Sequence, residues 1–407
     1  MARILQLLTA TAWDDQRQFF KQAPALAEAG HEVIFVAGDP GHAVDCPFRY
    51  VPLSRRRRRL ARMTGGLNLI RQVLSLRPHL VQLCSIEQLP LGLWLKAATS
   101  VRVVYDCRED MFHAMRDSKV WLPRWQRGAL AQATRLIETA ACRTFDGLVV
   151  SDPALYRMHD AMPPGRKSIF YNTPLLSQFG GELPALAERA YDLCLLGSMS
   201  RRSGLHVAAR AIGELARRGR RVRVLLIGTP GEDARGDLDE VVARHGLEDD
   251  VTVTGWKPYT EVPALLPRAR IGLVTLLDLP KYHHNIACKA FEYMACGMPC
   301  ICSDLPPQRF FVEEGRHGLF FEPGNPDSLA DAIETLLDDP ERLRAMGRAG
   351  REAAETRWNA EADQRRYRDF IDRLLRLPHR GAEPAPPMDA AGRREACDAA
   401  RARSLQR

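Results

Sequence analysis

Short apolar runs that alternate with longer helix-like segments are the feature that most constrains the fold of this chain. They form two series, which a stretch containing proline and glycine, residues 173–190, separates. Such runs are typical of buried parallel strands joined by helices, so the pattern predicts an α/β fold with two Rossmann-like domains. The first series covers 4–8, 33–37, 80–84, 101–106, 148–151 and 168–171, and the second covers 191–196, 222–227, 251–254, 271–276, 299–303 and 318–321.

The size and charge of the chain set broad limits on its function. Its 407 residues are enough for two or three domains. The formal net charge of +8 favours anionic partners, such as nucleotide diphosphates or anionic lipid. Frequent use of arginine codons in a GC-rich genome is an alternative explanation for this positive net charge. Nucleic acid is not an expected partner, because we find no recognisable binding motif.

Membrane spans and metal centres have no clear signal in the sequence. No apolar run reaches the roughly 18 residues that a membrane span needs, and residues 3–8 read as a strand rather than as a signal peptide core. The cysteines include no Cys-x-x-Cys pair, so neither a metal site nor a resident cofactor is predicted. In a reducing cytoplasm, where we expect the protein, five cysteines should be buried free thiols. These are Cys84, Cys107, Cys194, Cys300 and Cys302.

The stretch from Lys289 to Asp304 carries the clearest chemical pattern. It reads as a short helix, a tight turn and a buried strand. Lys289 and Glu292 lie three positions apart, so they share one helical face. Gly297 and Pro299 end the helix, because glycine tolerates a left-handed cap and proline cannot continue a helix. A cation and a carboxylate at the start of a helix beside a strand end suit a phosphate and a ribose diol. We therefore predict a nucleotide-sugar site.

This stretch resembles the signature Lys-x-Phe-Glu-Tyr-Met-Ala-x-Gly-x-Pro of family-4-like glycosyltransferases, the group 1 glycosyl transferases with a GT-B fold. The resemblance continues elsewhere. Tyr-Asp-Cys-Arg-Glu, residues 105–109, is similar to the family's Tyr-Asp-x-His-Glu, with Arg108 in place of His. Tyr-Asn-Thr-Pro, residues 171–174, resembles the loop that closes the first domain, and Gly-Leu-Phe-Phe-Glu-Pro, residues 318–323, resembles a later turn. Because these motifs occur in the expected order, the chain is identified as a member of this family.

The resemblance implies two Rossmann-like domains whose parallel sheets face a central cleft. On this basis residues 1–175 form an acceptor-binding domain and residues 176–357 form a nucleotide-sugar-binding domain. Residues 358–378 would form a helix that crosses back onto the first domain. The tail, residues 379–407, is predicted to be disordered, because it lacks a clear apolar face.

The predicted donor site lies in the second domain, at loops that follow strands. Ligands of open α/β sheets bind at such strand ends, and a helix N-terminus offers N–H groups to a phosphate. Arg201 or Arg202 would add charge-assisted hydrogen bonds, unless they are a solvated pair. The family commonly has Arg and Lys where this chain has Ser198 and Ser203. The predicted donor-binding residues are Gly197, Ser198, Arg201, Arg202, Gly228, His284, Asn285, Lys289, Phe291 and Glu292.

Each polar residue of this set has a predicted role. Glu292 would bind the ribose hydroxyls, and Lys289 would neutralise the leaving diphosphate; the alternative for both is a surface position on a helix. The family often has a further Glu eight positions before Glu292, where this chain has His284. His284 and Asn285 would bind sugar hydroxyls in its place.

The Asp-x-Asp pattern of Asp237 and Asp239 imitates the metal-binding motif of a different glycosyltransferase fold. Both residues lie on a predicted polar helix, residues 234–245. We interpret them as part of a solvated face, so no metal is predicted at the diphosphate.

The predicted acceptor side of the cleft belongs to the first domain. Asp106, Arg108 and Glu109 follow a buried strand and are expected to face the cleft. In an inverting enzyme Asp106 or Glu109 could deprotonate the acceptor hydroxyl, whereas in a retaining enzyme the departing phosphate serves as base and these residues orient the acceptor. Structural capping is the alternative for all three. Asp15 and Arg17 are the further predicted acceptor-binding residues.

Two features predict contact with a membrane surface. Five consecutive arginines run from Arg55 to Arg59, and cations of this kind attract anionic lipid or a lipid-linked diphosphate. Trp121 and Trp125 precede a long predicted helix, and interfacial tryptophan suits the headgroup region. Neutralising the arginines should release the protein from anionic vesicles at low salt, since each cation contributes about 1 kcal/mol there. Vesicle binding that is absent, or unchanged by the substitutions, would favour a soluble acceptor.

Two hypotheses for function follow. In the first, the chain is a glycosyltransferase that moves a sugar from a nucleotide-sugar donor to a glycan, lipid-linked or small-molecule acceptor, with retention. The catalytic residues would then be Asp106, Arg108, Glu109 and Lys289. In the second, the altered positions Ser198, Ser203, Arg108 and His284 indicate a non-catalytic donor-binding partner or a nucleotide-sugar epimerase.

Overall fold

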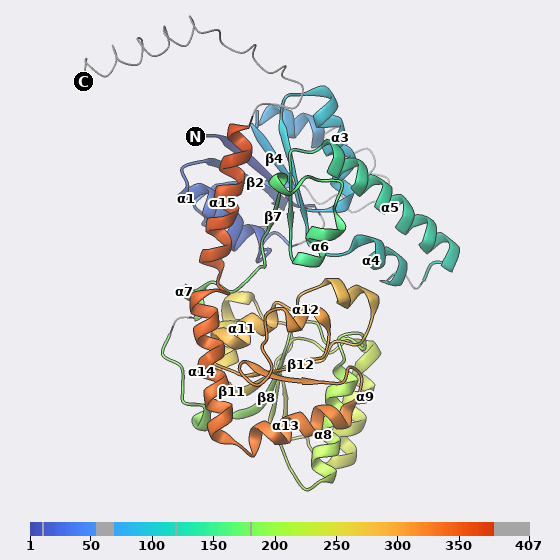
Figure 1. Cartoon of the computed structure of the whole chain (residues 1–407), viewed down its shortest axis with the longest axis vertical. Helices are drawn as coiled ribbons and strands as arrows, with labels where there is room; N and C mark the ends of the chain where they lie inside the picture. The colour runs from blue at the N-terminus through green and yellow to red at the C-terminus, as the bar shows by residue number, and fades with distance from the viewer. Residues whose placement is uncertain (10–11, 54–68, 119–120, 180, 378–407) are drawn as a thin grey trace, which may run out of the picture.

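The computed structural model describes residues 1–9, 12–53, 69–118, 121–179 and 181–377. Two parallel sheets, each covered by helices on both faces, are stacked along the long axis of the molecule (Figure 1). This confirms the predicted α/β class. The arginines from Arg55 to Arg59 and the tail at 379–407 lie outside the described residues, so the predictions for both stay predictions.

The first sheet has seven parallel strands in the order β3-β2-β1-β4-β5-β6-β7. Chain order reverses between β1 and β4, which pair through Ile4 with Leu80 and Leu7 with Leu83. Ligands of doubly wound sheets bind at such a switch point, beyond the carboxyl ends of the strands. The strands are β1 (Arg3–Leu7), β2 (Glu32–Gly38), β3 (Arg49–Leu53), β4 (Leu80–Leu83), β5 (Arg102–Cys107), β6 (Gly147–Val150) and β7 (Lys167–Ile169).

The sequence did not predict β3. This strand lies at the edge of the sheet, contains Pro52 and is only partly covered. Proline is tolerated on an edge because one side of the strand needs no ladder hydrogen bonds. The continuous apolar character that identified the inner strands is therefore missing from it.

The second sheet has six parallel strands in the order β10-β9-β8-β11-β12-β13. Its core includes five helices that pack on the two faces (Figure 1). The strands are β8 (Tyr191–Leu196), β9 (Val224–Ile227), β10 (Val251–Val253), β11 (Ala269–Val274), β12 (Cys300–Ser303) and β13 (Gly318–Phe321). The five helices are α8 (Leu205–Arg217), α9 (Glu232–His245), α11 (Lys289–Ala295), α13 (Pro326–Leu337) and α14 (Pro340–Thr356).

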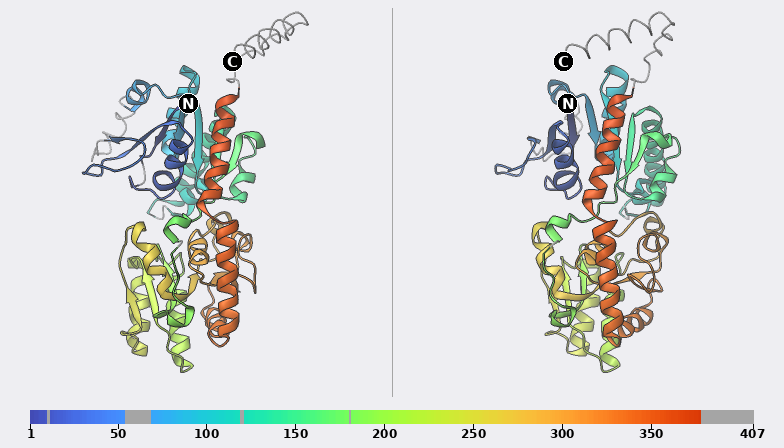
Figure 2. Two further views of the ribbon diagram at one scale, coloured as in Figure 1. Left: turned by 90° about the vertical axis from the view of Figure 1, so that its left-hand side faces the viewer. Right: turned by 60° about the vertical axis from the view of Figure 1, so that its left-hand side comes forward.

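Helix α15 (Ala360–Arg376) connects the last element of the second unit to the first sheet. Figures 1 and 2 show α14 and α15 following one another along one side of both units. Tyr367, Phe370 and Leu374 are buried in the same cluster as Ile4 and Val149 of the first sheet. The apolar face of α15 is therefore buried against the first unit, so the chain returns to the unit in which it began.

Further helices surround the first sheet: α1 (Ala23–Glu28), α3 (Leu89–Ala98), α4 (Met111–Ser118), α5 (Arg124–Thr144) and α6 (Pro153–Met158). The short helix α7 (Leu176–Phe179) follows between the two units, and the short helices α10 (Val262–Leu265) and α12 (Pro306–Arg309) belong to the second unit. Within the described ranges, no helix combines the length and the apolar character that a membrane crossing requires. Trp121 and Trp125, near the start of α5, are each 73% exposed.

The five cysteines predicted to be buried thiols are buried and free. Cys300 and Cys302 lie in β12, and Cys194 lies in β8. Cys84 follows β4, and Cys107 ends β5.

Candidate functional site

Two glycine loops form the floor of the candidate site, at the carboxyl ends of β8 and β9. Gly197 has φ of 93° and Gly228 has φ of 141°, both in the region that favours glycine. A Cβ atom on Gly228 would lie 2.4 Å from the carbonyl oxygen of Gly197. Close approach of the two backbones therefore requires glycine at 228. The two loops therefore lie side by side at the carboxyl edge of the sheet, where open α/β sheets bind their ligands.

The structure separates the two predicted phosphate-binding arginines. Arg201 makes a bidentate ion pair with Asp237 of α9, at 2.8 and 3.2 Å. Arg202 instead donates from Nη2 to the carbonyl oxygen of Asp117, in the first unit, at 2.8 Å. Asp237 is thus more than a solvated residue, since it holds Arg201 against α9. Asp239 remains largely exposed and pairs with Arg235 at 3.3 Å.

Lys289 and Glu292 occupy the first turn of α11, a helix that reaches the end of β8 through a hydrogen bond from the Leu196 amide to the Tyr293 hydroxyl at 2.9 Å. Glu292 is only 7% exposed. Burial raises the pKa of its carboxyl, and Lys21, the Tyr259 hydroxyl and Lys289 oppose that shift. Burial likewise lowers the pKa of Lys289, and Glu292 opposes the shift most. Among the described residues no hydrogen bond or ion pair holds the Lys289 ammonium, so it is available to a ligand.

The sequence did not identify Lys21 and Tyr259 as neighbours of Glu292. Lys21 belongs to a short helix of the first unit, η1 (Gln18–Gln22), and is buried. Its ammonium donates to the side-chain oxygen of Asn172 at 3.0 Å and lies 5.8 Å from the centre of the Tyr259 ring. In the sequence, the only indication of a special role for Lys21 was its position within a largely apolar stretch. The structure thus places a cation of the first unit near a carboxylate of the second.

His284 faces the first unit from η7 (Pro280–His284). Its ring centre lies 6.1 Å from that of His113 on α4. Its Nδ1 atom is buried and has no hydrogen-bond partner in the described part of the chain. The adjacent His283 is paired with Asp278 instead. Asn285 follows η7 directly and is half-buried.

Phe291 does not line the site, which corrects the prediction of a donor-binding role. Its side chain is fully buried. The ring packs 4.5 Å from that of Phe311 and 5.4 Å from that of Trp358, measured between centres. Position 291 follows Lys289 by two residues, so its side chain leaves α11 on nearly the opposite side from that lysine. The aromatic residue in this motif therefore anchors the helix.

Asp106 does not face the cleft, and this corrects its predicted role as a base. The side chain is only 1% exposed. Its carboxylate accepts hydrogen bonds from Arg17 Nη2 at 2.8 Å, Gln18 Nε2 at 2.8 Å, Gln22 Nε2 at 3.0 Å and Gln82 Nε2 at 3.2 Å. Burial alone would raise the pKa of Asp106, but Arg17 brings that pKa below the usual value. An enclosed carboxylate that holds its proton so weakly cannot receive the proton of an acceptor.

Arg17 is consequently a buried partner of Asp106 rather than an acceptor-binding residue. Its Nη1 atom also donates to the carbonyl oxygen of Phe170 at 2.5 Å. Asp15 and Arg108 form a separate pair that is partly accessible. Two parallel hydrogen bonds join them, at 2.7 and 2.6 Å. This bidentate arrangement fixes both side chains at the end of β5.

Several contacts between described residues link the two units near the predicted site. Glu109 pairs with Lys281 at 2.7 Å, His113 faces His284, and Arg202 donates to the Asp117 carbonyl. The residues predicted for the donor and acceptor sides therefore stand on facing edges. A ligand between these edges would contact both units.

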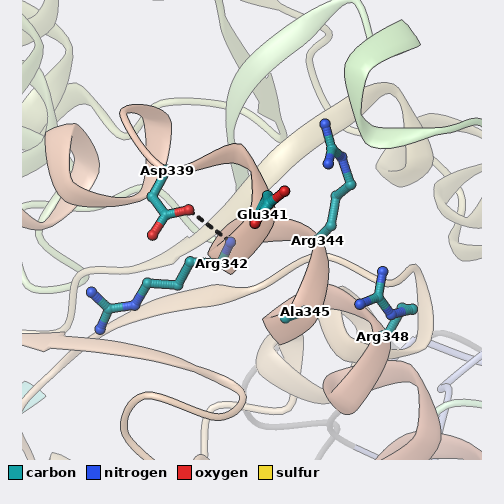
Figure 3. A pocket seen from close by; sticks show the side chains of 6 residues that line it. All are labelled: Asp339, Glu341, Arg342, Arg344, Ala345 and Arg348. Atoms are coloured by element: carbon teal, nitrogen blue, oxygen red, sulfur yellow. Dashed lines mark hydrogen bonds between the residues drawn. The ribbon is translucent and has the colours of Figure 1, made fainter.

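A separate surface hollow opens at the start of α14, with a volume of about 470 Å³ (Figure 3). The Asp339 carboxylate caps the helix there by accepting from the Arg342 amide at 2.9 Å. No residue of the predicted site lines this hollow. Its lining consists of Asp339, Glu341, Arg342, Arg344, Ala345 and Arg348.

Two protein families match this sequence. The family described as "Glycosyl transferases group 1" matches residues 184–353, and the family described as "Glycosyl transferase 4-like domain" matches residues 16–166. The two matches lie one on each of the two sheets. They confirm the resemblance drawn from the motifs.

Curated relatives cover part of the chain. The chain is 31% identical over 231 residues to the 2-deoxystreptamine glucosyltransferase of Streptomyces kanamyceticus. The matched residues cover 56% of this chain and 57% of that protein. It is 30% identical over 210 residues to the D-inositol 3-phosphate glycosyltransferase of Nocardia farcinica. Here the matched residues cover 50% of this chain and 45% of that protein. The chain thus spans about half the length of the curated relatives it matches.

Solved structures share the architecture along nearly the whole chain. Sucrose-phosphate synthase from Thermosynechococcus elongatus gives a TM-score of 0.73 at 19% identity, covering 92% of this chain and 99% of that one. HepE of Anabaena, in complex with UDP, gives a TM-score of 0.70 at 14% identity, covering 91% and 100%. At these identities the likeness shows the fold alone.

Proposed function

The chain belongs to the group 1 glycosyl transferases with a GT-B fold, and from this premise we propose that it transfers a sugar from a nucleotide-sugar donor to a hydroxyl acceptor with retention. One observation carries the proposal. Lys289 and Glu292 stand together on the first turn of α11, and no ion pair with a described residue occupies either side chain. The same helix reaches the end of β8, just before Gly197, where the Tyr293 hydroxyl accepts a hydrogen bond from the Leu196 amide at 2.9 Å. A cation and a carboxylate so placed suit a diphosphate and a ribose.

The donor roles follow from the chemistry of each side chain. Lys289 would stabilise the negative charge that grows on the leaving diphosphate. Glu292 would accept hydrogen bonds from the ribose hydroxyls, and the loops at Gly197 and Gly228 would bring backbone N–H groups to the phosphates. HepE of Anabaena, which shares this fold, has been solved with UDP-glucose at a TM-score of 0.70. That similarity supports a uridine diphosphate sugar as the first donor to test.

The acceptor would bind against the first unit, near the Asp15–Arg108 pair. Retention fits this site better than inversion, because Asp106 is enclosed and Glu109 already pairs with Lys281. The departing phosphate would then receive the acceptor proton. Two relatives are named for 2-deoxystreptamine and D-inositol 3-phosphate, so we include small cyclic alcohols of this kind among the acceptors to test.

One observation favours the second hypothesis, in which the chain is a non-catalytic donor-binding partner or a nucleotide-sugar epimerase. His284 stands where the family often has a Glu near the transferred sugar, and its Nδ1 atom has no hydrogen-bond partner among the residues that the structure describes. A change in the sugar on an unchanged nucleotide would identify an epimerase. Tight binding without turnover would identify a donor-binding partner.

A panel of UDP-, GDP- and dTDP-sugars tests the proposed function. Donor binding stabilises the folded state by mass action, so one donor should raise the melting temperature most. The same donor should be hydrolysed slowly without acceptor and rapidly with one. The anomeric configuration of the product, measured by NMR, tests retention. If no sugar is released from any donor that binds, the transferase proposal is wrong.

Replacing Glu292 by glutamine should weaken the binding of the free nucleoside diphosphate. A hydrogen bond to a charged group contributes about 1.5–3 kcal/mol, so the Kd should rise by about 10- to 100-fold. Glutamine keeps the size of the side chain, and the fold should survive. Isothermal titration calorimetry with UDP measures the change, and the exposed Glu248→Gln is the matched control. An unchanged Kd would remove Glu292 from the nucleotide site.

A further inference from the structure

A second cluster of chemically reactive side chains lies inside the first unit, away from the donor loops. It consists of Cys107 at the end of β5, Glu138 on α5 and His159 immediately after α6. One ligand atom from each lies within 4.8 Å of the others. Cys107 is fully buried, Glu138 is 6% exposed, and His159 is half-buried. The group is therefore enclosed but close to the surface through its histidine.

The distances within this Cys107 cluster match those between the ligands of one metal ion. Cys107 Sγ lies 3.4 Å from His159 Nε2 and 3.9 Å from Glu138 Oε1. Tetrahedral zinc, with bonds of about 2.3 Å to sulfur and about 2.0–2.2 Å to nitrogen and oxygen, separates such ligands by about 3.6 Å. An ion between the three atoms would thus need only small side-chain adjustments.

Glu138 also has no cationic partner among the described residues. Its carboxylate accepts from the Tyr105 hydroxyl at 3.0 Å and from the Cys107 thiol, but no ion pair reaches it within the described residues. Lys167, which lies beside His159, donates instead to the carbonyl oxygens of Tyr156 and His159. Buried carboxylates are ordinarily paired with a cation or coordinate a metal. A cation at the cluster would supply what is missing.

The groups behind the cluster are those that orient metal ligands. The second ring nitrogen of His159, Nδ1, lies 3.6 Å from the Cys142 sulfur, which leaves Nε2 facing Cys107. The Tyr105 hydroxyl fixes the Glu138 carboxylate. Outer partners of this kind set the ring orientation and the carboxylate position in metal sites. The histidine ring and the carboxylate of the cluster are therefore already held in fixed orientations.

We propose that Cys107, Glu138 and His159 bind a zinc ion. Zinc accepts sulfur, nitrogen and oxygen ligands. A thiolate and a carboxylate balance its two positive charges, and the imidazole binds as a neutral ligand. A water molecule would complete the tetrahedron. The ion would join β5, α5 and the end of α6, next to Arg108 and Glu109. The sequence does not indicate this site, because 31 positions separate Cys107 from Glu138 and 21 positions separate Glu138 from His159.

Metal analysis of the full-length protein tests the proposal. Protein purified without chelator, and then supplied with zinc and desalted, should hold close to one zinc per chain. Cobalt in place of zinc should give a thiolate-to-metal charge-transfer band in the near ultraviolet. Cys107→Ser and His159→Gln should abolish both signals. Cys46→Ser, a cysteine of the same unit outside the cluster, should leave both unchanged.

Tyr105→Phe provides a test that does not depend on the ligand variants folding. It keeps all three ligands and removes only the hydroxyl on Glu138, so the zinc Kd should rise by about 10- to 100-fold. Only trace zinc in the wild-type protein, together with no cobalt band, would overturn the proposal. Equal zinc in the wild type and Cys107→Ser would also overturn it. None of these readouts depends on sugar transfer, so this proposal and the proposed function can fail separately.

Discussion

Lys289→Ala is expected to lower kcat by about 10²- to 10³-fold, the loss that follows removal of one group stabilising transition-state charge. The affinity for the intact donor should change much less, because the diphosphate gains charge as the sugar departs. Single-turnover kinetics with saturating donor separate the two effects. Arg235→Ala, an exposed cation on α9 of the same unit, is the control and should leave kcat unchanged.

The pH dependence provides a second measure of Lys289. Burial lowers the pKa of its ammonium, so the protonated form that stabilises the leaving group is lost at lower pH than for an ordinary lysine near about 10.4. The wild-type rate should therefore fall on the alkaline side of its profile, and Lys289→Ala should lack that decline. Equal losses in kcat and in donor affinity would make Lys289 a ground-state binder only.

The sequence was sufficient to predict the architecture because the strands are buried on both faces. Inner strands such as β4 and β6 have no exposed residue, so they appear as continuous apolar runs. The turn at Gly297 was also readable, since its φ of 61° ends α11 as the motif predicts. The edge strand β3 was not, because partial exposure and Pro52 removed the signal.

The sequence was less informative about which way site residues face. A position at a strand end identifies the edge of the sheet but not the direction of a side chain. Asp106 and Arg108 are two positions apart in sequence, yet Asp106 is enclosed and Arg108 is accessible. Long-range partners decide this outcome, and the pairing of Asp106 with Arg17 spans 89 positions. The same limit applies to Lys21 and to the Cys107 cluster.

Asp106→Asn should be among the most destabilising single substitutions in the first unit. Removing one member of a buried ion pair costs about 3–5 kcal/mol, because the partner charge is left uncompensated. Asparagine would also place an NH₂ group among the donors of Arg17, Gln18 and Gln22. Urea unfolding measures the loss. The control Asp239→Asn removes an exposed pair, whose contribution is about 0–1 kcal/mol.

The acid stability of the protein should depend on the same carboxylate. The pKa of Asp106 is lowered in the folded state, so its contribution is present above the unfolded value of about 3.9 and is lost as the pH falls through the folded value. Asp106→Asn should therefore weaken the dependence of stability on pH in that acidic range. Unfolding curves collected from neutral to acidic pH would reveal this difference.

The double variant Arg17→Met/Asp106→Leu separates the cost of an orphaned charge from the value of the pair itself. Replacing both partners of a buried ion pair by apolar residues is often nearly neutral. The double variant should therefore be more stable than Asp106→Asn, and the coupling energy between positions 17 and 106 should be large. Additive losses would show that the two residues act independently. The enclosed Asp106 would then owe its place to the glutamine side chains around it rather than to Arg17.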